Sequence, residues 1–170
     1  MNQPIPLMVD FDVVFEEHYP GLIRYVGRLT GDADVAEDIA QEAMVRLFDH
    51  QVSGTDAGLR AWLYKTATHL VRDRYRVDTN RRKLLERHPV EPGAPEAPDR
   101  TLERGQARAA AREALDALPD RDREILLMRY SGFSYKEIAS AVGVAGTSVG
   151  TLLARAEQRF AEAVSAGEPA

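Results

Sequence analysis

Apolar side chains recur every three or four residues along almost the whole chain, the spacing that gathers them on one face of an α-helix. In the first such segment they fall at Phe11, Val14, Phe15, Tyr19, Leu22, Val26 and Leu29. The sequence shows neither the alternating pattern of a β-strand nor an internal repeat. The pattern therefore predicts an all-α fold.

The periodicity predicts two groups of helices separated by a stretch without any. The first group is expected over residues 11–29, 34–49 and 59–76, with a kink or a break in its first helix at Pro20. The second group is expected over residues 102–118, 120–131, 134–142 and 147–164. Between them His88–Asp99 reads HPVEPGAPEAPD, and its prolines fix φ and lack an amide hydrogen. We expect two small helical domains, residues 1–87 and 102–170, joined by a flexible, acidic, proline-rich linker over residues 88–101.

Several function classes are excluded by what the 170 residues lack. Without cysteine there is no disulfide, thiolate metal site or cysteine nucleophile, and no two histidines have helical metal-ligand spacing. The sequence has no glycine-rich phosphate loop and no nucleophile–base constellation, so we expect no catalytic residues, no metal and no cofactor. The N-terminus does not resemble a signal peptide and no apolar run could cross a bilayer, so a cytoplasmic location is expected.

The charge is distributed unevenly along the chain. A net charge of −5 argues against a protein that coats nucleic acid by itself. Four cationic or titratable residues nevertheless share one face of the third expected helix: Lys65, His69, Arg72 and Arg76. A glycine-containing polar loop over residues 51–58 precedes them. This stripe suits a melted DNA strand, whose phosphates would meet the charges while its bases stack or enter a pocket.

The segment Tyr135–Ala154, YKEIASAVGVAGTSVGTLLA, fits a helix-turn-helix. Ala139 is small where the two helices would cross, and Gly143 stands at the tight turn, where positive φ is tolerated. Val149 returns an apolar side chain to the shared core. A plain helical hairpin has the same apolar period, but it does not require these small residues. In a helix-turn-helix the second helix lies in the DNA major groove.

The face that this second helix would present to DNA carries no charge. Its outward positions are Ala145, Gly146, Thr147, Gly150, Thr151 and Ala154. Bidentate readout of bases by arginine or asparagine is therefore unavailable from this face. Thr147, Ser148 and Thr151 could bond phosphates or bases. Arg155, Arg159 and Lys136 could meet the DNA backbone, although a solvated surface explains these charges equally well.

Two stretches together resemble a known family. LPDRDREILLMRYSGFSYKEIASAVGV resembles the C-terminal promoter-binding domain of sigma factors. DVAEDIAQEAMVRLFDH, followed by LRAWLYKTATHLVRDRYR, resembles their N-terminal domain. In this order, over roughly residues 11–160, they are similar to the extracytoplasmic-function (ECF) group of the sigma-70 family. The resemblance implies a non-catalytic subunit that directs core RNA polymerase to promoters and assists their opening.

The resemblance also implies partners and the residues that meet them. The helix over residues 34–49 would dock on the coiled coil of the largest polymerase subunit through Glu37, Asp38, Gln41 and Glu42, although from the residues alone a solvated face is preferred. The cationic stripe (Lys65, His69, Arg72 and Arg76) would read the −10 element of promoter DNA, and the loop over residues 51–59 would hold an unstacked base. The −35 element would meet Thr147, Ser148, Thr151 and Arg155. The C-terminal domain would also contact the flap of the second-largest subunit, and an anti-sigma factor is an implied partner.

Some positions depart from the family pattern. Gly150 and Leu152 stand where typical relatives carry lysine or arginine, and His69 stands where many have asparagine. We therefore expect weak or shape-based recognition of the −35 element, or reliance on another protein. Trp62 and Tyr64 could stack on bases, but Trp62 falls on the apolar side, which favours a core position. The linker could thread toward the polymerase active site or serve only as a tether.

Two other function classes fit parts of the pattern. A stand-alone helix-turn-helix regulator would bind its promoter tightly without polymerase, and the net acidity argues against it. A helical adaptor, similar to an anti-sigma factor, would bind protein partners and no DNA, which the uncharged recognition face allows. Promoter-specific transcripts from core polymerase with this protein would separate both from a sigma factor.

Overall fold

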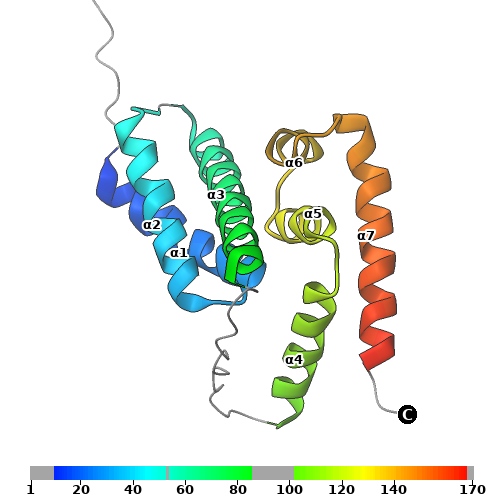
Figure 1. The fold of residues 1–170 in the computed structure, drawn as a ribbon. Coiled ribbons are helices and arrows are strands. Elements are labelled where there is room, and N and C mark those ends of the chain that lie inside the picture. The colour runs from blue at the N-terminus through cyan, green and yellow to red at the C-terminus, as the bar shows by residue number, and fades with distance from the viewer. Residues whose placement is uncertain (1–9, 53, 86–101, 168–170) are drawn as a thin grey trace, which may run out of the picture.

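In the computed structural model, residues 10–52, 54–85 and 102–167 are described, and within these ranges they form seven helices and no strand (Figure 1). The helices are α1 (Phe11–Thr30), α2 (Ala33–Asp49), α3 (Asp56–Leu85), α4 (Leu102–Asp116), α5 (Asp120–Tyr130), α6 (Tyr135–Val142) and α7 (Gly146–Gly167). The all-α prediction is confirmed. The expected linker over residues 88–101 lies outside the described residues.

The first three helices pack against one another and form a unit that we call the N-lobe. Asp10 caps α1 by accepting from the Asp12 amide at 3.0 Å, and Gly31 ends it with a φ of 72°. The core of the N-lobe contains Leu22, Val26 and Leu63, each fully shielded from solvent. Burial of such side chains stabilises a fold by about 1.5–3 kcal/mol each.

Two details of the N-lobe differ from the sequence expectation. Helix α1 continues through Pro20, so the alternative of a break there is wrong. Pro20 lies on the exposed side, where water can satisfy the carbonyl that lacks its helical partner. Helix α3 begins three residues earlier than expected and runs on to Leu85, because arginine and lysine favour helix even without an apolar stripe.

The last four helices, α4–α7, form the C-lobe, which contains the helix-turn-helix. The chain turns by 89° between α6 and α7. Ser134 and Glu137 form a capping box at the start of α6, and Gly143 ends that helix with a φ of 73°. Val149 is fully buried and Ala139 is 8% exposed. The small, glycine and apolar positions of the motif thus have the environments that the sequence predicted.

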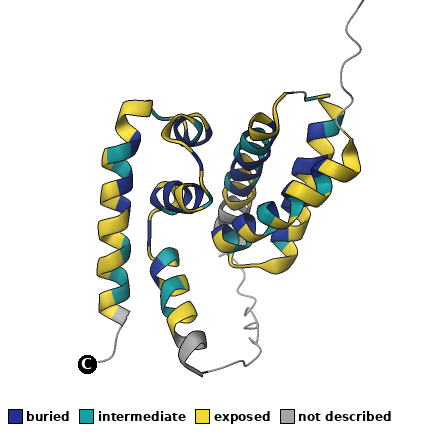
Figure 2. Ribbon diagram, turned by 180° about the vertical axis from the view of Figure 1, so that it is seen from behind, coloured by how far each residue is buried: buried dark blue, intermediate teal, exposed yellow. Residues whose placement is uncertain are grey.

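The two lobes pack against each other, with α3 against α6 and α1 against α5. Figure 2 shows that exposed residues follow the outer sides of α2 and α7, the helices farthest from this junction. Among the described residues no single helix is long and apolar enough to cross a membrane; α6 and α7 reach that threshold only when taken together across their sharp bend.

Candidate nucleic-acid interface

The cationic stripe of α3 is divided between solvent and the C-lobe. Lys65 Nζ lies 3.2 Å from Ser140 Oγ of α6, and Arg72 Nε lies 2.7 Å from Glu124 Oε1 of α5. His69 and Arg76 are exposed, and Arg76 pairs with Asp73 on its own helix at 3.4 Å. The four side chains share one helix, but two of them are held by the other lobe.

Glu124 is the strongest partner in this junction. Its carboxylate is 3% exposed and receives two hydrogen bonds from the Arg72 guanidinium, the second between Nη2 and Oε2. Hydrogen bonding to Glu124 raises the pKa of Arg72, outweighing the opposing effect of burial. A buried carboxylate without a cation would be costly, so Arg72 supplies the counter-charge that Glu124 needs while the lobes are in contact.

Aromatic rings fill the junction next to the stripe. Tyr64, only 4% exposed, has its ring centroid 4.6 Å from that of Phe133 in the C-lobe and 4.8 Å from that of Tyr25. The Arg60 guanidinium lies 4.3 Å from the Phe133 ring centroid and donates to the Ser131 carbonyl. Such a cation over a ring stabilises contact by about 0.5–2 kcal/mol. Trp62 is half-buried against the N-lobe core, as its place on the apolar side predicts.

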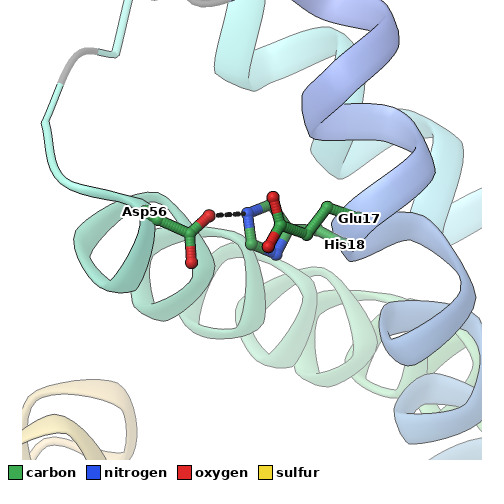
Figure 3. Close-up of side chains that lie close together, drawn as sticks. All are labelled: Glu17, His18 and Asp56. Atoms are coloured by element: carbon green, nitrogen blue, oxygen red, sulfur yellow. Dashed lines mark ion pairs between the residues drawn. The ribbon is translucent and has the colours of Figure 1, made fainter.

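The first residue of α3, Asp56, is anchored to α1 by His18 (Figure 3). His18 is 5% exposed, and its Nε2 lies 2.8 Å from Asp56 Oδ1. With Glu17 these residues offer three ligand atoms within 4.8 Å of one another, of types that hold divalent cations. Sequence spacing missed this group because Asp56 comes from another helix. His18 already lies at ion-pair distance from Asp56, so the arrangement needs no ion.

The polar strip of α2 is accessible in this arrangement. Glu37, Asp38, Gln41 and Glu42 are all exposed. Gln41 Nε2 donates to Glu37 Oε1 at 3.3 Å, and Arg46 pairs with Glu42 at 2.8 Å. Figure 1 places α2 on the side of the N-lobe away from the C-lobe. A partner could therefore reach this strip whether or not the lobes are in contact.

The expected DNA face of α7 is open to solvent and weakly charged. Thr147, Ser148, Thr151 and Arg155 are exposed. Arg159, by contrast, pairs with Asp122, which is 5% exposed, and so holds α7 against α5.

The Glu137 carboxylate in the capping box of α6 accepts hydrogen bonds from the Ser134 side chain and amide, and these bonds lower the pKa of Glu137.

Comparison with known proteins matches both lobes to one family. Residues 14–81 match the family Sigma-70 region 2, and residues 108–160 match Sigma-70, region 4. ECF RNA polymerase sigma factor SigL of Mycobacterium tuberculosis is 32% identical over 145 residues, which cover 80% of this chain and 78% of SigL. The chain belongs to the ECF sigma factor family. RNA polymerase sigma factor YlaC of Bacillus subtilis is a second relative, 26% identical over 147 residues, covering 84% of this chain and 85% of YlaC.

Solved structures agree in fold with this ECF sigma factor. Sigma factor RpoE, in its complex with the anti-sigma factor NepR from Bartonella quintana, superposes with a TM-score of 0.73 at 24% identity. The superposition covers 94% of this chain and 99% of RpoE. CnrH, in complex with the cytosolic domain of CnrY, gives a TM-score of 0.67 at 20% identity, covering 93% of this chain and 89% of CnrH. The solved structures thus share the fold of two helical lobes, and the family matches identify the chain as an RNA polymerase sigma factor.

Proposed function

We propose that this ECF sigma factor binds core RNA polymerase through α2, opens promoter DNA with α3 and contacts upstream DNA with α7, while catalysing no reaction itself. The observation that carries the proposal is the cationic stripe of α3 in a chain of this family: four residues on one face, next to the aromatic ring of Tyr64. Residues 1–87 would form the polymerase and −10 domain, and residues 102–170 the −35 domain, joined by residues 88–101.

The polymerase contact is assigned to Glu37, Asp38, Gln41 and Glu42 of α2. Their exposed carboxylates and amide suit a basic, polar surface such as the coiled coil of the largest subunit, giving register and fast association. The C-lobe would meet the flap of the second-largest subunit. An anti-sigma factor is a further proposed partner, supported by the two solved relatives, which were captured with NepR and CnrY.

The −10 contact is assigned to Lys65, His69, Arg72 and Arg76. Because Lys65 and Arg72 are engaged by the C-lobe, a DNA strand reaches them only after the lobes separate. Polymerase contacts at α2 and in the C-lobe would hold the two lobes apart on the enzyme. The proposal therefore places DNA binding after assembly with core polymerase.

The −35 contact is assigned to Thr147, Ser148, Thr151 and Arg155. Neutral hydroxyls and one arginine offer little base discrimination, so recognition of this element would be weak or based on DNA shape. Strong, sequence-specific upstream protection in a footprint of the holoenzyme, abolished by Thr147→Ala or Thr151→Ala, would contradict this part of the proposal.

The proposal is tested by reconstitution with core polymerase. Transcript starts mapped after overexpression supply a promoter, and the purified chain with core should then yield specific transcripts from it. The variant Lys65→Gln/Arg76→Gln should form open complexes at least about a hundredfold less well, since each hydrogen bond to a charged group contributes about 1.5–3 kcal/mol. The affinity of this double variant for core polymerase should match that of the wild type. The control Arg121→Gln, which changes an exposed arginine of α5, should keep wild-type transcription activity. Core polymerase that neither retains the chain nor gains start-site selectivity would refute the proposal.

A further inference from the structure

Helices α1 and α3 lie side by side and run in the same direction. Tyr25 of α1 meets Thr68 of α3 through their hydroxyl oxygens, 2.8 Å apart. Further along both helices, Tyr75 Oη donates to the Thr30 carbonyl at 3.3 Å. The last two turns of α1 therefore lie beside the part of α3 that carries Lys65 to Arg72.

Two arginines, Arg24 and Arg28, occupy this stretch of α1, one turn apart on one face. Both are exposed, and neither has an ion pair or a side-chain hydrogen bond with another described residue. Together with Arg60 and Tyr64 of α3 and Ser131 of the C-lobe they line a cavity of about 340 Å³ between the lobes. Glu17 is the acidic residue of this cavity, so its lining carries an excess of positive charge.

The other cations on this side of the N-lobe are all engaged by the C-lobe. Arg60 donates to the Ser131 carbonyl, Lys65 meets Ser140, and Arg72 pairs with Glu124. The C-lobe thus engages the α3 half of one cationic face, made of Arg60, Lys65 and Arg72, while Arg24 and Arg28 form its exposed α1 half beside the cavity. Within the part of the chain that the structure describes, the α1 half of this face lacks the internal counter-charge that the α3 half has.

We propose that Arg24 and Arg28 form a second row of phosphate contacts for the melted promoter strand, beside the row on α3. The inference rests on the proposed function and extends its DNA site onto α1. Packed helices lie about 8–10 Å apart, so a strand along α3 can place phosphates within reach of long arginine side chains on α1. Separation of the lobes would also remove Phe133 from Tyr64 and leave an aromatic ring at the edge of both rows.

Single-stranded DNA fits this face better than an acidic polypeptide does. A cationic groove that follows the backbone, bordered by an aromatic side chain for base stacking, is the usual arrangement for single strands. The face is also continuous with the stripe already assigned to the −10 element. An acidic partner would need neither that continuity nor a ring placed between the charges.

The test measures how salt affects binding of holoenzyme to a forked DNA, duplex upstream and single-stranded over the −10 element. Arg24→Gln/Arg28→Gln should lower the slope of log affinity against log salt by about 1.4, since each single-strand phosphate contact contributes about 0.7. Affinity at physiological salt should fall about tenfold. Arg24→Gln and Arg28→Gln should each lower the slope by about 0.7, and Arg121→Gln, which removes one charge from α5, should leave it unchanged. Core binding and helical content should match the wild type.

The variant Lys65→Gln/Arg76→Gln separates failure of this inference from failure of the proposed function. A lowered slope for that variant but an unchanged slope for R24Q/R28Q would overturn the inference and leave the proposed function standing. Unchanged slopes for both would overturn both. The variant R24Q/R28Q could instead lose binding to core polymerase or to an acidic protein partner while its DNA slope stays unchanged. That result would assign the two arginines to the protein partner and overturn the inference.

Discussion

At the scale of single residues, the N-lobe buries two hydroxyls that satisfy each other. Tyr25 is 2% exposed and Thr68 is fully buried. Thr68 Oγ1 donates to the Tyr64 carbonyl at 2.7 Å, so its one hydrogen is committed and it must accept from Tyr25. Burial raises the pKa of Tyr25 far above its ordinary value, which keeps the phenol protonated and able to donate.

This order of donation predicts unequal effects for two nearly isosteric substitutions. Thr68→Val removes the acceptor and leaves the buried Tyr25 hydroxyl without a partner, which should lower the free energy of unfolding by about 1–3 kcal/mol. Tyr25→Phe should lower it by only about 1 kcal/mol, because Thr68 keeps its bond to the Tyr64 carbonyl. The double variant should lose less than the sum of the two, as urea unfolding of the full chain would measure. A strictly additive double variant would contradict the pairing.

The cationic stripe illustrates what sequence can and cannot predict about single residues. The spacing of Lys65, His69, Arg72 and Arg76 follows from helix geometry, so their common face was predictable. Glu124, the partner of Arg72, lies 52 residues away in a charged segment whose pattern is that of a solvated surface. Helical periodicity reports which residues share a face, but not which distant face meets it. The position of Arg24 and Arg28 beside the stripe could not be predicted for the same reason, since two arginines on one helix usually indicate only a solvated surface.

At the scale of elements, two glycines of the helix-turn-helix have opposite roles. Gly143 ends α6 in the left-handed region, with a φ of 73°, where a side chain is strained. Gly150 lies inside α7, and a Cβ added there would meet Tyr135 Cε2 at 3.5 Å, an ordinary contact. The first glycine is required by the turn, whereas the second only weakens its helix.

Alanine at these two positions should therefore change stability in opposite directions. Gly150→Ala should raise the free energy of unfolding by about 1 kcal/mol, the helix-propensity difference between the two residues. Gly143→Ala should lower it by about 1–2 kcal/mol, the cost of left-handed backbone for a residue with a side chain. Urea unfolding of both variants beside the wild type measures the effect. Destabilisation by G150A would show that α7 has no room for the methyl group.

Element boundaries were predictable where local chemistry defines them. Ser134 and Gly143 delimit α6 by a cap at each end, and the sequence located that helix to within one residue. The far end of α3 has no such signal, since propensity rather than an apolar stripe extends it to Leu85. At Pro20 the rule that proline interrupts a helix failed to give a break, because the freed carbonyl lies on the exposed side.

At the scale of the whole molecule, polar contacts join the lobes beside the packing of Tyr64 on Phe133. Arg123 donates to the Leu29 carbonyl at 3.1 Å and Arg112 donates to the Gly31 carbonyl, both at the end of α1. Arg72 with Glu124 adds the one ion pair recorded between described residues of the two lobes. Two helical lobes were predictable from the apolar pattern, but their contact was not, because no local signal marks a polar face that another lobe covers. Polar interfaces of this kind usually allow domains to move.

Glu124→Gln should therefore shift the free chain toward separated lobes. The amide keeps the shape of the carboxylate but removes the charge that Arg72 neutralises. Because the Arg72 side chain is 36% exposed, the loss should be about 1–2 kcal/mol, less than for a fully buried pair. Small-angle X-ray scattering should show a larger radius of gyration, and the free chain should bind forked DNA more tightly because Arg72 is released. Asp122→Asn is the matched control: it removes a buried carboxylate of α5 that pairs with Arg159 inside the C-lobe, and should leave both measurements unchanged. An E124Q chain with wild-type dimensions and DNA affinity would mean that the ion pair does not hold the lobes together.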